Sequence, residues 1–161
     1  RLLELCGGYE THILDYGCGA GDDGLLFERL GFHSSFADIP SKAFEFAKWR
    51  MKNWWRMDDI DLGVFYHIGI DEIPHHHVVW CMDVLEHIAP DKQYNFLDTL
   101  ASLGDVIFVN LVNDPKADNR LHYQMDVPNL LDYVSRKWNG YCQEFYEGRT
   151  TLLIYGEKVI M

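Results

Sequence analysis

A glycine-rich stretch near the start of the chain contains the residues whose types and spacing first suggest a ligand site. In "ILDYGCGAGDD" (13–23), three alternating glycines, Gly17, Gly19 and Gly21, follow an apolar run that ends in an acidic residue. Glycine lets the backbone turn tightly and lets a ligand approach where a Cβ would clash. The stretch therefore predicts a strand that ends in a loop against which a ligand lies.

The acidic residues around this loop restrict the kind of ligand. A dinucleotide fingerprint needs a glycine where the chain has Asp22, which is followed by Asp23. Two carboxylates beside a helix N-terminus would repel a pyrophosphate, so NAD or FAD fits poorly and a phosphate-free ligand with a positive centre fits better. Asp38 follows 21 residues after Gly17, where a carboxylate can accept both hydroxyls of a ribose. The alternative for Asp22 and Asp38 is helix capping.

A second group of polar residues lies in "DVLEH" (83–87). On a helix, Asp83, Glu86 and His87 occupy positions i, i+3 and i+4 and share one face. The favoured interpretation is a capping box, with Asp83 as N-cap and Glu86 returning to its backbone N–H. Further along the chain, His122 in "NRLHYQMD" is either a solvated loop histidine or a base for an acceptor proton, since histidine can act near neutral pH.

Alternating strand and helix patterns must position these residues. Apolar runs and turn signals predict strands over 11–17, 34–39, 63–68, 78–82 and 105–112, and helices over 22–32, 40–57, 83–103 and 127–138. Within 83–103, Pro90 is placed to break or restart the helix. Residues 140–160 are typical of an antiparallel hairpin that turns at Glu147-Gly148. The alternation predicts an α/β fold with an open, mostly parallel sheet and helices on both faces. Ligands of such sheets bind beyond the carboxyl ends of the strands.

Three motifs together resemble one known family. "ILDYGCGAG", "FADI" and "VVWCMDVLEHI" are similar to the motifs of class I S-adenosylmethionine-dependent methyltransferases, and the last is most similar to the ubiquinone-biosynthesis O-methyltransferase branch. The resemblance covers roughly residues 10–112. It implies a Rossmann-like, seven-stranded sheet with an antiparallel last strand, and S-adenosylmethionine as the cofactor.

The resemblance also implies a role for each residue that matches a motif. Gly17 and Gly19 would approach the methionine moiety, and Asp15 would orient their loop. Asp38 would hold the ribose, with Ile39 against the adenine. The adenine edge would also meet the residues after the third strand, for which the candidates are Gly69, Ile70 and Asp71. The expected cofactor-binding residues are Asp15, Gly17, Cys18, Gly19, Asp38, Ile39, Ile70 and Met82.

The expected catalytic residues are His87 and His122, as the histidines nearest the acceptor in such a site. The sulfonium makes its methyl group electrophilic enough, so the protein must mainly align the acceptor, exclude water and remove a proton from a hydroxyl acceptor. Some relatives with Glu in place of Asp83 bind a divalent metal through the trio of this motif, and carboxylates suit Mg²⁺ or Mn²⁺. Asp is one methylene shorter, so a divalent metal is possible here but no metal site is expected.

The composition restricts the class of protein. The chain has 161 residues, 48% of them hydrophobic, which predicts a single domain that spans residues 1–161. The sequence begins at Arg1, so an upstream segment could be missing. A net charge of -11 makes nucleic acid an unlikely partner. No apolar run is long enough to span a membrane. Four cysteines without C-x-x-C spacing indicate reduced thiols in a cytoplasmic protein. The three consecutive histidines, His75, His76 and His77, are interpreted as a surface turn.

Three functional hypotheses remain open. The first is a methyltransferase that acts on a small-molecule acceptor, at oxygen or nitrogen. The second is a methyltransferase that modifies protein or RNA, although the charge disfavours RNA. The third is a non-catalytic module that binds S-adenosylmethionine and acts by interaction. The acceptor and the oligomeric state are left open.

Overall fold

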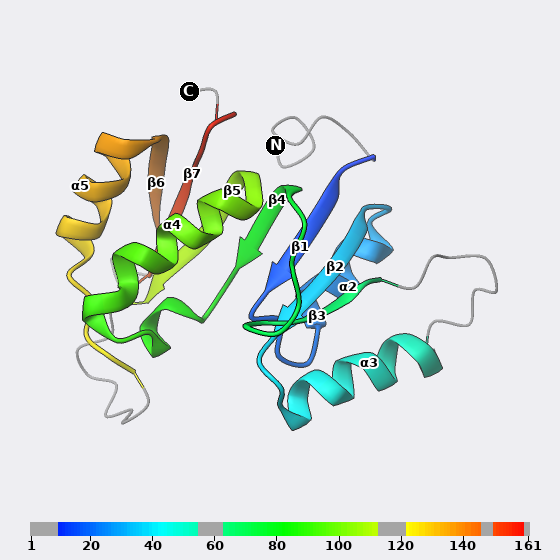
Figure 1. Cartoon of the computed structure of the whole chain (residues 1–161). Helices are drawn as coiled ribbons and strands as arrows, with labels where there is room; N and C mark the ends of the chain where they lie inside the picture. Colours follow the sequence, from blue (N-terminus) through cyan, green and yellow to red (C-terminus); the bar gives the residue numbers. More distant parts are fainter. Residues whose placement is uncertain (1–9, 55–62, 113–121, 146–149, 160–161) are drawn as a thin grey trace. The chain divides into compact units, whose positions relative to one another are not determined.

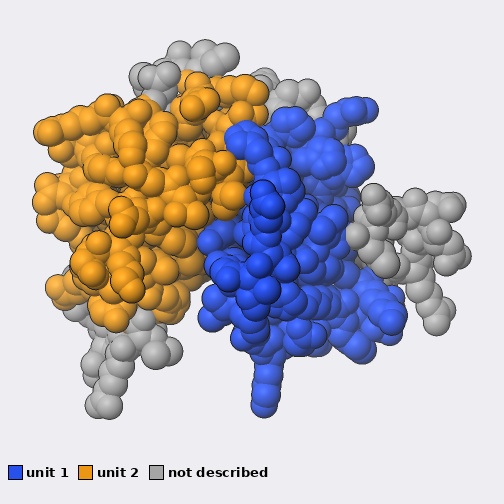
Figure 2. Space-filling view, in the orientation of Figure 1, with its two compact units in different colours: residues 1–78 blue, residues 79–161 orange. Residues whose placement is uncertain are grey.

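The computed structural model describes residues 10–54, 63–112, 122–145 and 150–159 (Figure 1). The chain forms two compact units, residues 1–78 and 79–161 (Figure 2), and each is described by itself. In the described part, no helix combines the length and the apolar character that crossing a membrane requires. Within the same part, Cys18 and Cys81 are free thiols.

The first unit alternates strands and helices. Its elements are β1 (His12–Tyr16), α2 (Asp22–Arg29), β2 (His33–Asp38), α3 (Lys42–Trp54), β3 (Phe65–His67) and the beginning of β4 (His76–Cys81). Strand β2 pairs in parallel with β1 on one side and β3 on the other, with Tyr16 opposite Ala37 and Asp38 opposite His67. Parallel pairing aligns the carboxyl ends of these strands at one edge, where the glycine loop also begins.

The core of the first unit holds α2 close to β2. Phe36 is fully buried and stacks on Phe65, with ring centroids 4.8 Å apart. Gly24 faces this ring so closely that a Cβ in its place would lie 2.2 Å from Phe36 Cε1. The missing side chain lets the first turn of α2 approach β2, and this approach positions the loop between Tyr16 and Asp22.

The second unit ends in antiparallel strands. It contains η1 (Leu85–His87), η2 (Pro90–Lys92), α4 (Gln93–Leu103), β5 (Gly104–Val112), α5 (Val127–Lys137), β6 (Asn139–Phe145) and β7 (Thr150–Gly156). Strand β7 pairs antiparallel with both β5 and β6. The predicted antiparallel C-terminal strands are therefore confirmed, while the predicted turn at residues 147–148 falls outside the described residues. The joining of all strands into one seven-stranded sheet, and the single domain, stay predictions.

The helical prediction over residues 83–103, with a break or restart at Pro90, is wrong for the part before Pro90. Residues 85–87 and 90–92 form 3₁₀ turns, and the α-helix starts only at Gln93. The reason is Pro90, which disfavours the α conformation in the preceding residue. Ala89 is accordingly extended, with φ −56° and ψ 139°. Asp83 and Glu86 are therefore not the first turn of an α-helix.

Candidate functional site

The glycine loop lies against the end of β2. The backbone N–H groups of Gly17 and Cys18 donate to the carbonyl of Ala37, at 2.7 and 3.1 Å. Gly17, Gly19 and Gly21 have φ values of 77°, 52° and 75°, in the left-handed region that glycine adopts without strain. The three predicted glycines therefore form the turn, because each occupies a conformation that disfavours other residues.

Asp15 ties the end of β1 to the first turn of α2. Its Oδ2 accepts the backbone N–H of Gly24 at 2.9 Å, and only 4% of the residue is exposed. Burial raises the pKa of Asp15 to about 7; the bond from Gly24 opposes this rise, and nearby carboxylates such as Asp38 add to it. The side chain thus spans the base of the loop, where the resemblance implies that it orients the turn.

Asp38 contacts the loop from the end of β2. Its Oδ2 accepts the backbone N–H of Gly19 and its Oδ1 accepts that of Ile39, both at 2.6 Å. A carboxylate has about four acceptor positions, so these two bonds leave lone pairs for further donors. Asp38 does not cap the next helix, because Ser41 Oγ instead accepts the N–H of Phe44 at 3.1 Å.

Asp22 does not cap a helix either. The N-cap of α2 is Gly21, which has no side chain to cap the helix. Asp22 instead pairs with Arg50 of α3 at 2.6 Å, and the same guanidinium nitrogen donates to the carbonyl of Ala20 at 2.9 Å. Arg50 was not predicted, because no local spacing relates residues 28 positions apart in the sequence.

The two isoleucines expected beside the adenine are unusually exposed. Ile39 is 61% exposed after β2, and Ile70 is 72% exposed in the turn after β3. Cys18, in contrast, packs its thiol against the buried cluster that includes Leu25 and Phe44, and burial raises its thiol pKa well above the ordinary range. Contact between Cys18 and a ligand would therefore involve mainly its backbone.

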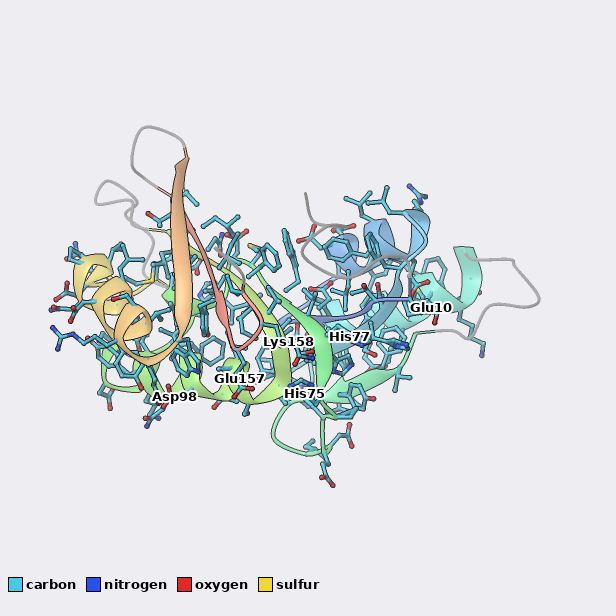
Figure 3. All side chains as sticks on the ribbon, turned by 90° about the horizontal axis from the view of Figure 1, so that it is seen from above. Glu10, His75, His77, Asp98, Glu157 and Lys158 are labelled. Carbon is cyan, nitrogen blue, oxygen red and sulfur yellow. The ribbon has the colours of Figure 1, made fainter. Side chains whose placement is uncertain are left out.

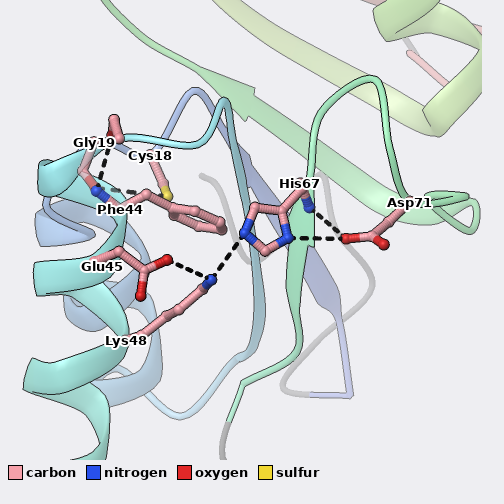
Figure 4. Close-up of polar contacts among 8 residues, drawn as sticks. Cys18, Gly19, Phe44, Glu45, Lys48, His67 and Asp71 are labelled. Carbon is pink, nitrogen blue, oxygen red and sulfur yellow. Dashed lines mark hydrogen bonds and ion pairs between the residues drawn. The ribbon is translucent and has the colours of Figure 1, made fainter.

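A chain of polar contacts beside this turn was not anticipated from the sequence. Lys48 Nζ lies 2.9 Å from Glu45 Oε1 and 3.0 Å from His67 Nε2 (Figure 4). On the other side of the ring, His67 Nδ1 lies 3.3 Å from Asp71 Oδ2. Of these four residues, the sequence indicates only Asp71 as a candidate for a site. No sequence signal joins them, because the contacts depend on how α3 packs against β3.

In the second unit, Asp83 forms a reciprocal pair with Asn110 of β5. The backbone N–H of Asp83 donates to Asn110 Oδ1 at 2.7 Å, and Asn110 Nδ2 donates to Asp83 Oδ1 at 2.6 Å. Asp83 has a φ of 55°, which is uncommon for a residue other than glycine. The predicted capping box is wrong, because Asn110 and not Glu86 receives this N–H. Met82, directly before it, is half-buried at the end of β4.

Glu86, His87 and His122 come together in the second unit. Their possible ligand atoms all lie within 4.8 Å of one another, and the two imidazole rings are 4.7 Å apart and nearly perpendicular. The next residue, Tyr123, donates its N–H to the carbonyl of Glu86 at 2.7 Å, which fixes the loop that carries His122. The two expected catalytic histidines are thus neighbours.

Glu86 is the buried acid of this trio. Only 2% of the residue is exposed, and among the described residues its Oε2 has no hydrogen-bond partner. Burial raises its pKa; a backbone hydrogen bond opposes the rise, Asp83 adds to it, and His87 and His122 lower it. One carboxylate and two imidazoles are a donor set that divalent metals accept, so these residues fit a metal ion. The trio differs from the one considered from the sequence, since Asp83 is replaced by His122.

The three consecutive histidines are not only a surface turn. Strand β4 begins at His76, which is 6% exposed and whose Nδ1 lies 2.7 Å from the carbonyl of Pro74. His75 and His77 lie on either side of it in the sequence (Figure 3). His77 Nδ1 accepts the backbone N–H of His12 at 3.0 Å, so this histidine supports the strand edge.

The structure, rather than the sequence, connects the chain to known proteins. No protein-family model matches it, and no curated protein sequence matches it. Its structure resembles magnesium protoporphyrin IX methyltransferase (ChlM) from Synechocystis PCC 6803 with bound SAH, with a TM-score of 0.74 and 16% identity over 96% of this chain and 78% of that chain.

Two further solved structures are similar. Small RNA methyltransferase HEN1 has a TM-score of 0.73 and 16% identity over 99% of this chain and 24% of that chain. An O-methyltransferase family protein from Burkholderia thailandensis has a TM-score of 0.71 and 16% identity over 92% of this chain and 51% of that chain. Together these likenesses show that the chain has the α/β, Rossmann-like fold of class I S-adenosylmethionine-dependent methyltransferases.

Proposed function

We propose that this protein is a methyltransferase that uses S-adenosylmethionine. The observation that carries the proposal is the carboxylate of Asp38, which lies at the end of β2 and contacts the glycine turn at Gly19. A carboxylate in this place can accept the hydroxyls of a ribose, and the left-handed glycines leave room for a ligand beside the backbone. The likeness to structures with the methyltransferase fold supports the same cofactor.

The charge around the turn favours this cofactor over a dinucleotide. Asp15, Asp22, Asp23 and Asp38 gather near the loop, and Arg50 is paired with one of them. Anionic phosphates would be repelled by such a set, whereas a cofactor with a sulfonium centre carries no phosphate. Asp15 would hold the loop, and Ile39 and Ile70 would supply apolar surface for the adenine.

In the second unit, His87 and His122 are the proposed acceptor-side residues. The bound cofactor supplies an activated methyl group, so the work left to the protein is to orient the acceptor, exclude water and accept a proton where the acceptor is a hydroxyl. Histidine is the side chain commonly used as a general base in such a step. Glu86 beside them can stabilise the imidazolium that would result, because its carboxylate lies within reach of both rings.

The acceptor is proposed to be a small molecule, modified at oxygen or nitrogen. The proposed relation to the ubiquinone-biosynthesis branch rests on "VVWCMDVLEHI" alone. Protein and RNA methylation are the alternative, and non-catalytic binding of the cofactor is a further one. Location in the cytoplasm is proposed from the absence of paired cysteine motifs.

A second candidate is methyl transfer assisted by a divalent metal. The observation that favours it is the buried Glu86 Oε2, which has no hydrogen-bond partner among the described residues and faces two histidines. These three residues would hold the ion, which would supply a Lewis acid for an acceptor oxygen. Glu86→Gln should weaken Mn²⁺ binding, measured by electron paramagnetic resonance, by at least about tenfold. Asp91→Asn removes an exposed carboxylate of η2 and should leave Mn²⁺ binding unchanged. Mn²⁺ binding by the Glu86 variant equal to that of wild type would reject the metal site.

Calorimetry with the purified protein tests the principal proposal. S-adenosylmethionine or S-adenosylhomocysteine should bind, and NAD should not. Asp38→Ala should weaken binding by about 1.5–3 kcal/mol, the scale of hydrogen bonds to a charged group, while the exposed Asp91→Ala serves as the control. Heat with NAD and none with S-adenosylmethionine would overturn the cofactor assignment. An unchanged affinity in the Asp38 variant would reject its contact with the ribose.

A further inference from the structure

The contact with Lys48 selects one tautomer of the neutral His67 ring. An ammonium group can only donate hydrogen bonds, so His67 Nε2, 3.0 Å from Lys48 Nζ, must be the acceptor. The proton of the neutral ring is then on Nδ1, which faces Asp71 Oδ2 at 3.3 Å. The two neighbours therefore select the same tautomer from opposite sides of the ring (Figure 4).

The same carboxylate also closes the turn after β3. Asp71 Oδ2 accepts the backbone N–H of His67 at 2.6 Å, and the carbonyl of His67 accepts the N–H groups of Ile70 and Asp71, both at 3.0 Å. Gly69, with a φ of 82°, completes the turn. Ile70, which is 72% exposed, thus projects from a turn whose ends are held together by His67 and Asp71.

Helix α3 anchors this turn to the rest of the first unit. Lys48 comes from α3, lies 4.5 Å from the centre of the Phe44 ring and is held by Glu45. Phe44 in turn meets the edge of His67, with ring centroids 5.3 Å apart. Directly after β3, Ile68 donates its N–H to the carbonyl of Asp38, the residue proposed to hold the ribose. The turn is therefore tied to α3 and to Asp38.

We propose that Lys48, His67 and Asp71 form a positioning network that holds Ile70 against the base of the bound cofactor, and that the network works only while His67 is neutral. This inference rests on the proposed function, because it needs the cofactor at the ends of β2 and β3. The three residues act through the turn rather than by touching reacting atoms.

Acid should open the network for a simple electrostatic reason. Protonation of His67 at Nε2 replaces its acceptor by a donor and places a second positive charge beside Lys48. The charged groups that contact the ring are Lys48 from α3 and Asp71 from the turn, and Glu45 of α3 pairs with Lys48. Asp71 would still attract an imidazolium, but the contact with α3 would be lost. A comparison of binding at two pH values tests the network, because histidine is the side chain that ordinarily changes charge between pH 5 and 8.

The test is the pH dependence of S-adenosylhomocysteine binding, measured by calorimetry on the full chain at pH 7.5 and 5.5. The wild type should bind about five- to tenfold more weakly at pH 5.5. His67→Gln keeps an acceptor for Lys48 but cannot be protonated, so it should bind within about twofold of wild type at pH 7.5 and lose most of the pH dependence. His67→Phe removes the acceptor and should bind about fivefold more weakly at pH 7.5.

A matched control and a direct observation separate this network from other sources of pH dependence. His75→Gln removes a histidine at the start of β4 and should retain the wild-type profile. Asp15 also titrates near neutral pH, and its contribution would persist in His67→Gln. In the ¹⁵N spectrum of labelled wild type at pH 7.5, His67 should show a protonated Nδ1 and an unprotonated Nε2.

The outcomes distinguish the network from the function on which it rests. Binding with equal pH dependence in wild type and His67→Gln, or a proton on His67 Nε2 at pH 7.5, would overturn the network and leave the cofactor site intact. If the wild type binds no S-adenosylhomocysteine at either pH, the proposed function itself fails, and the network falls with it. A much weaker pH dependence of S-adenosylhomocysteine binding in His67→Gln than in wild type supports both the network and the proposed function.

Discussion

Asp15 is the residue whose environment most clearly predicts a response to pH. Burial raises its pKa from 3.8 to about 7, so between these values the folded chain holds a proton that the unfolded chain has released. Its contribution to stability is therefore lost as pH rises toward 7. Asp15→Asn cannot ionise and can still accept the N–H of Gly24. It should raise the free energy of unfolding at pH 8 by on the order of 3 kcal/mol, measured by urea denaturation. Equal stability of the two proteins at pH 8 would show that Asp15 is not destabilised by burial.

At the residue scale, the sequence predicted what depends on local spacing and missed what depends on packing. Gly17 and Asp38 could be identified because a turn and the end of the next strand follow from short-range patterns. Arg50 and His67 could not, since their contacts with Ala20 and Lys48 exist only once α3 has packed. His122 was proposed singly, and its meeting with Glu86 likewise depends on tertiary structure.

At the scale of elements, the contact between α2 and β2 predicts a sensitive position. A Cβ at Gly24 would lie 2.2 Å from Phe36 Cε1, and Phe36 is fully buried. Gly24→Ala should therefore destabilise the protein by about 1–3 kcal/mol through overpacking, even though alanine favours helices. Adding Phe36→Leu removes the colliding ring atoms, so the double variant should be more stable than the sum of the two single effects. Strict additivity in urea denaturation would argue that α2 and β2 are not in close contact.

The order of strands and helices followed well from the sequence, but their ends did not. Strands were predicted from apolar runs that are indeed buried, such as 105–112, within which Ile107 and Val109 are fully inaccessible. Within the helix predicted over 83–103, the sequence indicates the interruption at Pro90, but the part before it is not α-helical because Asp83 pairs with Asn110. The periodicity of apolar residues carries no record of such a competing contact.

Across the whole molecule, the fold is recognisable where the sequence is not. Likeness at 16% identity extends over 96% of the chain, because a fold depends on the pattern of buried and exposed positions more than on residue identity. The carboxyl ends of β1 and β2 hold Asp15 and Asp38, while the amino ends of β1, β2 and β4 gather histidines. His12 stacks on His33 with ring centroids 4.9 Å apart and lies 5.7 Å from His77. The first unit thus has titratable groups of opposite kind at the two ends of its strands.

The histidines at the amino ends of β1 and β4 should make the folded molecule sensitive to acid. Burial lowers the pKa of His76 below 6.5, its bond to Pro74 opposes this, and His12, His75 and His77 add to the lowering; burial likewise lowers the pKa of His12. As pH falls below 6.5, the unfolded chain takes up protons first, so stability is complete above pH 6.5 and is lost as pH falls through the folded pKa values.

His76→Asn tests this for the buried ring. Asparagine keeps a donor near the position of Nδ1 for the carbonyl of Pro74, but it does not titrate. The variant should be less stable than wild type at pH 7.5, because it fills the buried site less well. It should also lose less of its free energy of unfolding between pH 7.5 and 5.5. His75→Asn changes the neighbouring residue and should follow the wild-type profile. An equal loss in wild type and His76→Asn would mean that His76 takes up its proton without unfolding the strand edge, and the acid sensitivity would then have to come from His12.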